Sequence, residues 1–133
     1  MKSPLLKSND ISIDFGLLLL RLTSGGSLLS HGWTKLQKAL QGVTEFADPI
    51  GIGPEISLYL AIFAEFFCAL LIIIGFAHRL ALIPLIITML VAFFVVHATD
   101  PFGTKELAFL FLSIFVTLFF TGPGKYAIDR LFK

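Results

Sequence analysis

Two ionisable residues interrupt long apolar segments of this sequence. Arg21 lies inside an apolar segment over residues 11–30, and Glu65 lies inside another over residues 55–76. A charge at this depth in a bilayer is costly unless it is paired or hydrated, so such residues usually face the protein interior. We predict that Arg21 and Glu65 meet near the midplane as a bidentate ion pair. The pair would either handle protons or a ligand, or fix the register of two helices.

Further polar residues fall near the ends of the apolar segments and suggest an outer polar layer. Its expected members are His31, Lys35, Glu55, Tyr59, His97 and Glu106. The histidines and carboxylates could relay protons, and Lys35 could hold a carbonyl or an anionic group. Placement at helix ends explains the histidines and Glu106 equally well without a function. Since no HExxH or ExxH spacing is present, no metal site is predicted.

Composition places the chain in the membrane. Of its 133 residues, 56% are hydrophobic and only 14% are charged, whereas soluble domains carry about 25% charged residues. The net charge is +1 and no basic cluster is present, so the sequence indicates no nucleic-acid partner. Cys68 is the single cysteine, which excludes dithiol chemistry within the chain.

Four apolar segments must position the polar residues, and they cover residues 11–30, 55–76, 80–98 and 105–121. Each approaches the roughly 20 residues that an α-helix needs to cross a bilayer. In hydrocarbon the backbone must satisfy its own hydrogen bonds, which favours helices. We predict an all-α membrane protein, a four-transmembrane-helix bundle that forms a single domain over residues 1–133.

The connections between the segments suggest a further helix and an orientation. Residues 33–47 carry apolar side chains at helical spacing, which predicts an amphipathic helical segment in the first extracytoplasmic loop. Six Lys and Arg residues lie on the membrane side that holds both termini, and three lie on the other side. Because basic residues are more frequent on the cytoplasmic side, we predict that both termini are cytoplasmic. On that side lie Lys2, Lys7, Arg79, Lys125, Arg130 and Lys133, and on the other lie Lys35, Lys38 and Lys105.

The order of these motifs resembles the DoxX family of small four-helix membrane proteins over about residues 11–130. The motifs are Leu20-Arg21-Leu22, His31-Gly32-Trp33-Thr34-Lys35-Leu36, Glu65, Gly75-Phe76-Ala77-His78-Arg79-Leu80, His97, Glu106 and Gly122-Pro123-Gly124-Lys125-Tyr126-Ala127-Ile128-Asp129. Family members often have Ser-Leu where this chain has Ala127-Ile128. The resemblance implies a bacterial-type inner (plasma) membrane protein whose polar core is Arg21, Lys35, Glu65, His97 and Glu106. It also implies kinship with the DoxD-type subunit of thiosulfate:quinone oxidoreductase.

We therefore expect a quinone- or redox-linked membrane subunit, a component of a membrane oxidoreductase complex. A pocket between the helices would open outward, with Arg21 and Glu65 as its floor and His31, His97 and Glu106 at its mouth. Its ligand could be a quinone or another small hydrophobic molecule, and its partners an oxidoreductase or a second copy of the chain. A non-catalytic anchor or assembly subunit is the alternative. A small-solute or proton transporter is disfavoured because no inverted repeat is evident.

Overall fold

The computed structural model describes residues 3–7 and 10–132, and within these ranges it contains helices and no strand. Four of its helices are long and apolar enough to cross a membrane, which confirms the predicted all-α architecture. The spans are α1 (Ile13–Leu40), then α2 (Pro54–Ile62) with η2 (Phe63–Cys68) and α3 (Ala69–Ile74), then α4 (His78–Val91) with η3 (Ala92–Val96), and finally α5 (Phe102–Thr121). Short 3-10 turns cover Pro4–Leu6 and Ile128–Phe132.

The first helix is longer than the apolar segment that it contains. Ser12 caps its start, because its hydroxyl accepts a hydrogen bond from the Phe15 amide at 3.2 Å. The helix then continues without interruption to Leu40. The predicted amphipathic segment is therefore helical in its first part, but it extends α1 instead of forming a separate helix. Between Ser30 and Leu40 the sequence has no proline and no turn motif that would end the helix.

Two of the spans contain a π-helical turn. One, η2, lies between α2 and α3, and the other, η3, ends the third span. A π turn places an extra residue in the helix and changes which side chains face the core, and such turns often occur at functional sites. Glu65 lies inside η2.

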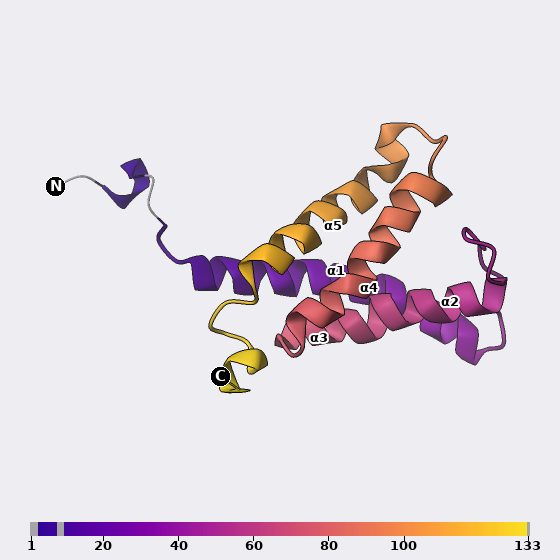
Figure 1. Ribbon diagram of the computed structural model, residues 1–133, viewed down its shortest axis with the longest axis horizontal. Helices are drawn as coiled ribbons and strands as arrows, with labels where there is room; N and C mark the ends of the chain where they lie inside the picture. The colour runs from indigo at the N-terminus through magenta and orange to yellow at the C-terminus, as the bar shows by residue number, and fades with distance from the viewer. Residues whose placement is uncertain (1–2, 8–9, 133) are drawn as a thin grey trace.

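The spans pack as two hairpins that cross. The first helix packs along η2 and α3, and α4 packs mainly against α5 and also against η2. Figure 1 shows α1 and the second span side by side along the long axis, with the α4–α5 hairpin crossing them obliquely. The α4–α5 connection lies apart from the α1–α2 connection in this view, so the hairpins diverge toward that end of the molecule.

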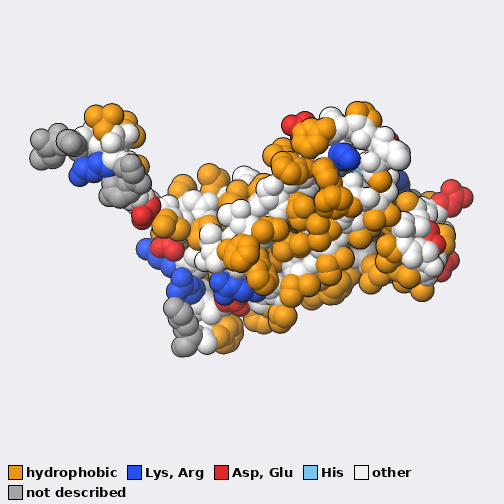
Figure 2. Space-filling model, turned by 45° about the horizontal axis from the view of Figure 1, so that its top comes forward, with side chains coloured by type: hydrophobic (Ala, Val, Ile, Leu, Met, Phe, Trp, Pro, Cys, Tyr) orange, Lys and Arg blue, Asp and Glu red, His pale blue; other side chains and the backbone are white. Residues whose placement is uncertain are grey.

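A small core holds the crossing together, and most apolar side chains point outward. Fully buried side chains include Ile72, Leu82, Leu85, Phe115 and Leu118. Hydrophobic side chains also cover much of the flank of the molecule in Figure 2. An exposed apolar flank around four spans is what contact with a lipid bilayer requires.

The C-terminal segment and the α3–α4 turn lie at the end of the bundle where α1 begins (Figure 1). This is the end predicted to face the cytoplasm. Lys2 and Lys133, two of the six basic residues behind that prediction, lie outside the described residues. The cytoplasmic placement of this end stays a prediction.

Candidate functional site

Glycines on α1 set how this helix meets the second span. A Cβ added at Gly32 would lie 2.5 Å from the carbonyl carbon and oxygen of Glu65, so the backbones touch there. About two turns earlier on α1, a Cβ added at Gly25 would lie 2.7 Å from the side chain of Ile73. Because the two spans run in opposite directions, this register places Glu65 level with Gly32 and the residues just after it.

That register joins Glu65 to Lys35. The Lys35 Nζ lies 2.6 Å from Oε1 and 2.7 Å from Oε2 of Glu65. The Glu65 side chain is 6% exposed, whereas that of Lys35 is 26% exposed. A short, two-point contact with a charged donor is among the stronger hydrogen bonds in proteins. The Glu65 carboxylate is thus held in the interior by Lys35, whose side chain comes from α1 and is partly exposed.

Three aromatic residues lie near this ion pair, two of them by their place in the sequence and one by a contact with Lys35. Trp33 and Phe66, neighbours of the pair along the chain, have ring centroids 6.1 Å apart. The Lys35 ammonium also lies 5.9 Å from the ring centroid of Phe46, in the connection after α1. The ion pair and these three rings form what we call the Lys35–Glu65 site.

The predicted ion pair between Arg21 and Glu65 is wrong. Arg21 is 1% exposed, and its guanidinium donates to backbone carbonyls. Nε and Nη2 donate to Ile72 and Ile73 at 2.8 Å each, and Nη1 donates to Pro123 at 2.9 Å and to Tyr126 at 3.0 Å. The prediction failed because α1 is longer than expected and continues to Leu40. Arg21 therefore lies in the first part of α1, about 20 Å along the helix axis from Lys35, which pairs with Glu65.

Arg21 joins the end of α3 to the C-terminal segment, which folds back over the α3–α4 turn. The carbonyls of Ile72 and Ile73 belong to the last turn of α3, where helix carbonyls lack intrahelical partners and a cation is favoured. In the C-terminal segment, the Asp129 carboxylate accepts hydrogen bonds from the Ala77 and His78 amides at 2.7 and 2.9 Å. Asp129 thereby caps the start of α4.

Sequence reasoning missed the role of Asp129. Its signal was the motif from Gly122 to Asp129, which had been noted only as part of the family pattern. The structure now explains why this motif and the one from Gly75 to Leu80 occur in the same chain. The Asp129 amide donates to the Gly75 carbonyl at 2.9 Å, so the two motifs are bound to each other.

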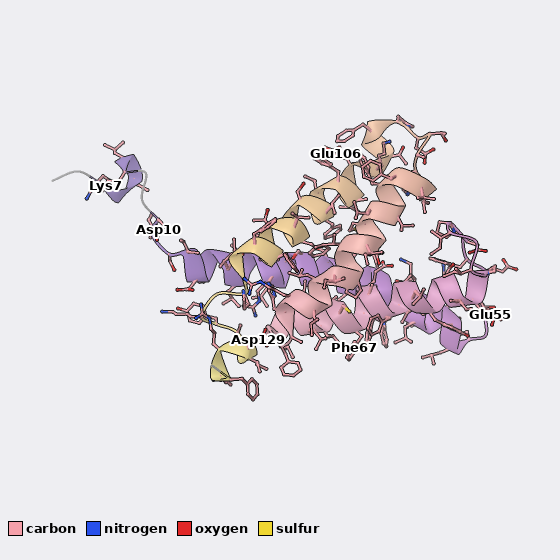
Figure 3. All side chains as sticks on the ribbon, viewed as in Figure 1. Lys7, Asp10, Glu55, Phe67, Glu106 and Asp129 are labelled. Carbon is pink, nitrogen blue, oxygen red and sulfur yellow. The ribbon has the colours of Figure 1, made fainter. Side chains whose placement is uncertain are left out.

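The outer polar residues do not assemble into one layer. His31 is exposed on α1, and Glu106 is exposed on α5. His97 Nδ1 lies 2.8 Å from the Asp100 carboxylate in the α4–α5 connection. Figure 3 shows Glu106 at the tip of the α4–α5 hairpin, away from Glu55 at the start of α2. This follows from the divergence of the hairpins, and of the expected layer only Lys35 joins Glu65.

The pocket expected between the helices cannot have Arg21 and Glu65 as a common floor, because they lie at different depths. Two cavities stand out in the described part of the chain. One of about 670 Å³ adjoins the α1–α2 connection, and one of about 450 Å³ adjoins the α3–α4 turn. Neither is lined by Arg21, Lys35 or Glu65. No three His, Cys, Asp or Glu side chains converge on a metal-sized position within residues 3–7 and 10–132.

Comparison with known proteins connects this geometry to a family. The DoxX family model matches residues 16–98. The chain is 35% identical over 123 residues to "Inner membrane protein YqjF" of Escherichia coli (strain K12), covering 89% of this chain and 92% of that protein. It is 30% identical over 119 residues to "Putative oxidoreductase CatD" of Bacillus subtilis (strain 168), covering 89% of this chain and 87% of that protein. No solved structure matches.

Proposed function

The chain belongs to the DoxX family, and from this premise we propose that it is a redox-linked subunit of the inner membrane in which Lys35 and Glu65 bind and protonate a quinone. The names of the two relatives are "Inner membrane protein YqjF" and "Putative oxidoreductase CatD". The four spans make this chain a multi-pass membrane protein in contact with the lipid bilayer. A quinone is a membrane-soluble electron carrier and reaches such a site through the bilayer.

The observation that carries the proposal is the Lys35–Glu65 ion pair, at 2.6 and 2.7 Å, whose carboxylate belongs to a π-helical turn. Reduction of a quinone to a quinol takes two electrons and two protons. The Lys35 ammonium can bind a quinone oxygen as negative charge develops there and give it one proton, which water at the exposed side of Lys35 replaces. Glu65, once protonated from the same side, can give the second proton. The electrons would come from a redox-active partner protein, since Cys68 is alone and buried.

The surroundings of the ion pair suit a flat ring. Trp33 and Phe66, which pack against each other, are close to Lys35 and Glu65 in the sequence, and Lys35 remains partly exposed. A quinone that approached from the Lys35 side could take one of the ammonium hydrogen bonds now directed to Glu65. The ring could then stack against an aromatic side chain. The ligand would then lie beside the last turns of α1, which carry Lys35, and beside η2 in the middle part of the second span, which carries Glu65.

A non-catalytic anchor is the second candidate, and Arg21 supports it. All of the bonds that Arg21 makes go to backbone carbonyls and hold segments together. The Lys35–Glu65 pair could likewise serve only to fasten α1 to η2. The two candidates therefore differ in whether this pair recognises a ligand.

Equilibrium binding of a short-chain ubiquinone to the purified protein tests the proposal. Trp33 is the only tryptophan and adjoins the proposed site, so quenching of its fluorescence reports occupancy. We expect Lys35→Met and Glu65→Gln each to weaken binding by at least about tenfold, because each removes a polar contact to the quinone. Lys38→Met is the matched control, since Lys38 is an exposed lysine on the same helix, and it should bind as the wild type does.

The exchanged pair, Lys35→Glu with Glu65→Lys, separates the two candidates. If the pair is only a fastening, the exchange restores both stability and cellular phenotype. If the pair binds a quinone, the exchange restores stability but not binding, because the ammonium and the carboxylate have changed places. Folded Lys35→Met and Glu65→Gln proteins that bind ubiquinone as tightly as the wild type would refute the quinone site.

A further inference from the structure

A second polar site lies at the opposite end of the molecule, and the Lys35–Glu65 site does not use it. It is the cavity of about 450 Å³ between the α3–α4 turn, the end of α5 and the C-terminal segment. Arg79, Arg130, His78, Asp129 and Leu80 contribute to its lining. Its volume lies within the roughly 300–1,000 Å³ of small-molecule sites. Figure 2 shows basic side chains gathered at this end of the molecule.

The two arginines of the cavity retain hydrogen-bonding capacity. Arg79 donates through Nε to the Phe119 carbonyl at 2.9 Å, and Arg130 donates through Nε to the Gly124 carbonyl at 3.3 Å. Within the described residues, neither makes a hydrogen bond through Nη1 or Nη2, in contrast to Arg21, which uses all three nitrogens. The terminal nitrogens of a guanidinium form the edge that binds phosphate oxygens in pairs.

The charge of the cavity favours an anion. Asp129 is its acidic residue, and both of its oxygens already accept amide hydrogen bonds at the start of α4. Two arginines against one carboxylate leave a net positive charge. His78, which is 1% exposed, adds no donor for the anion: its Nε2 faces the Leu118 carbonyl at 3.3 Å, so Nδ1 of the neutral ring is an acceptor. This Nδ1 lacks a hydrogen-bond partner among the described residues and could accept from a headgroup hydroxyl. Buried polar atoms are rarely left in this state, so the lining has capacity for a further polar contact.

Gly122 lets Arg79 reach this position. Its φ of +81° favours glycine, and a Cβ added there would lie 3.3 Å from Nη2 of Arg79. The Arg79 guanidinium therefore lies close to the backbone of Gly122, at the end of α5. Any side chain at position 122 would strain the backbone and crowd the arginine.

The apolar neighbours of the cavity indicate a lipid. Leu80 lines it and is 71% exposed, and Phe120, in the last turn of α5, is 77% exposed. The cavity lies where two spans end, which is the depth of lipid headgroups. We propose that it binds the headgroup of an anionic phospholipid, with the phosphate between Arg79 and Arg130 and an acyl chain along Leu80. Basic pockets between helix ends are a known setting for such recognition.

Thermal unfolding of the detergent-purified protein, titrated with phosphatidylglycerol, tests the proposal. Cys68 is the only cysteine and is 1% exposed, so its reaction with a fluorescent maleimide reports unfolding. We expect phosphatidylglycerol to stabilise the protein at low mole fraction, and phosphatidylcholine and free glycerol 3-phosphate to have little effect. Arg79→Gln and Arg130→Gln should each raise the half-saturating phosphatidylglycerol concentration roughly tenfold.

Lys125→Gln is the matched control, because Lys125 is an exposed basic residue at the same end that does not line the cavity. It should leave the titration unchanged. Because Arg79 also holds the end of α5, Arg130→Gln is the variant that tests the site if Arg79→Gln fails to fold. Equal loss in Lys125→Gln, or an unaltered titration in folded Arg130→Gln, overturns the proposal. Full stabilisation by glycerol 3-phosphate would overturn the assignment to a lipid.

Discussion

At the scale of single residues, Arg21 shows how a bilayer protein can keep a charge in its interior when no carboxylate of the described residues forms an ion pair with it. Its four hydrogen bonds, at 2.8–3.0 Å, reach carbonyls on α3 and on the C-terminal segment. Carbonyls at a helix end cannot find water in hydrocarbon, so each bond satisfies an acceptor as well as the arginine. Arg21 thus holds α1, α3 and the C-terminal segment together through hydrogen bonds to backbone carbonyls, and not through an ion pair.

We predict that Arg21→Met destabilises the protein by about 2–4 kcal/mol, since bonds from a charged donor to buried carbonyls are lost. Unfolding by sodium dodecyl sulfate in mixed micelles measures the change. Arg21→Lys should fall between Arg21→Met and the wild type, because an ammonium keeps the charge but cannot reproduce the planar fork. An Arg21→Met protein as stable as the wild type would contradict this role.

Sequence analysis identified Arg21 and Glu65 correctly as interior charges, since each stands out within an apolar segment. It could not identify their partners. Every partner of Arg21 is a backbone carbonyl, which any residue type supplies, so no side-chain pattern points to it. The partner of Glu65 depends on the register of two helices, and that register depends on where α1 ends.

At the scale of elements, the contact between α1 and η2 carries the Lys35–Glu65 site. The hydrophobic pattern of the sequence predicted both spans but not their π-helical turns. A single extra residue alters the spacing of apolar side chains only locally, so the pattern does not reveal it. The continuation of α1 through residues 31–40 was also hidden, since its polar side chains resemble those of an interfacial segment. The sequence shows a glycine at position 32, but it does not show that the backbone of η2 packs against that glycine.

Gly32→Ala should therefore separate α1 from η2. The added Cβ would lie 2.5 Å from Glu65 backbone atoms, and relieving this overlap is expected to cost about 1–3 kcal/mol. The same unfolding titration measures the loss, and Trp33 fluorescence should shift because its packing changes. Gly26→Ala is the control: nothing lies within 4 Å of a Cβ there, so it should be neutral or slightly stabilising. Equal stability of the two variants would argue against the close contact.

At the scale of the whole molecule, hydropathy was sufficient for the number of spans, because the bilayer requires long apolar helices from any chain that crosses it. The crossing and divergence of the two hairpins (Figure 1) could not be anticipated. Crossing angles follow from the shapes of side chains in contact, and these are not known until the register is known. The expected outer polar layer failed for this reason.

The predicted orientation can be tested with a membrane-impermeant maleimide. Cys68 is 1% exposed, so an introduced cysteine should dominate labelling of the folded protein. We expect Glu45→Cys, in the α1–α2 connection, to label in intact cells, and Lys125→Cys to label only after lysis. The reverse pattern would place the termini outside and would assign the basic cavity to the other leaflet.

The fastening at Arg21 has a consequence for biosynthesis. Two of its acceptors, Pro123 and Tyr126, follow it by 102 and 105 residues in the chain. A ribosome therefore delivers Arg21 to the membrane long before it has made these partners. Until the last segment emerges, the nascent first span holds an incompletely bonded charge, which favours retention beside the insertion machinery or in a hydrated environment. We therefore expect chains that stop before Pro123 to be substrates for membrane proteases, because Arg21 cannot make two of its four hydrogen bonds in them.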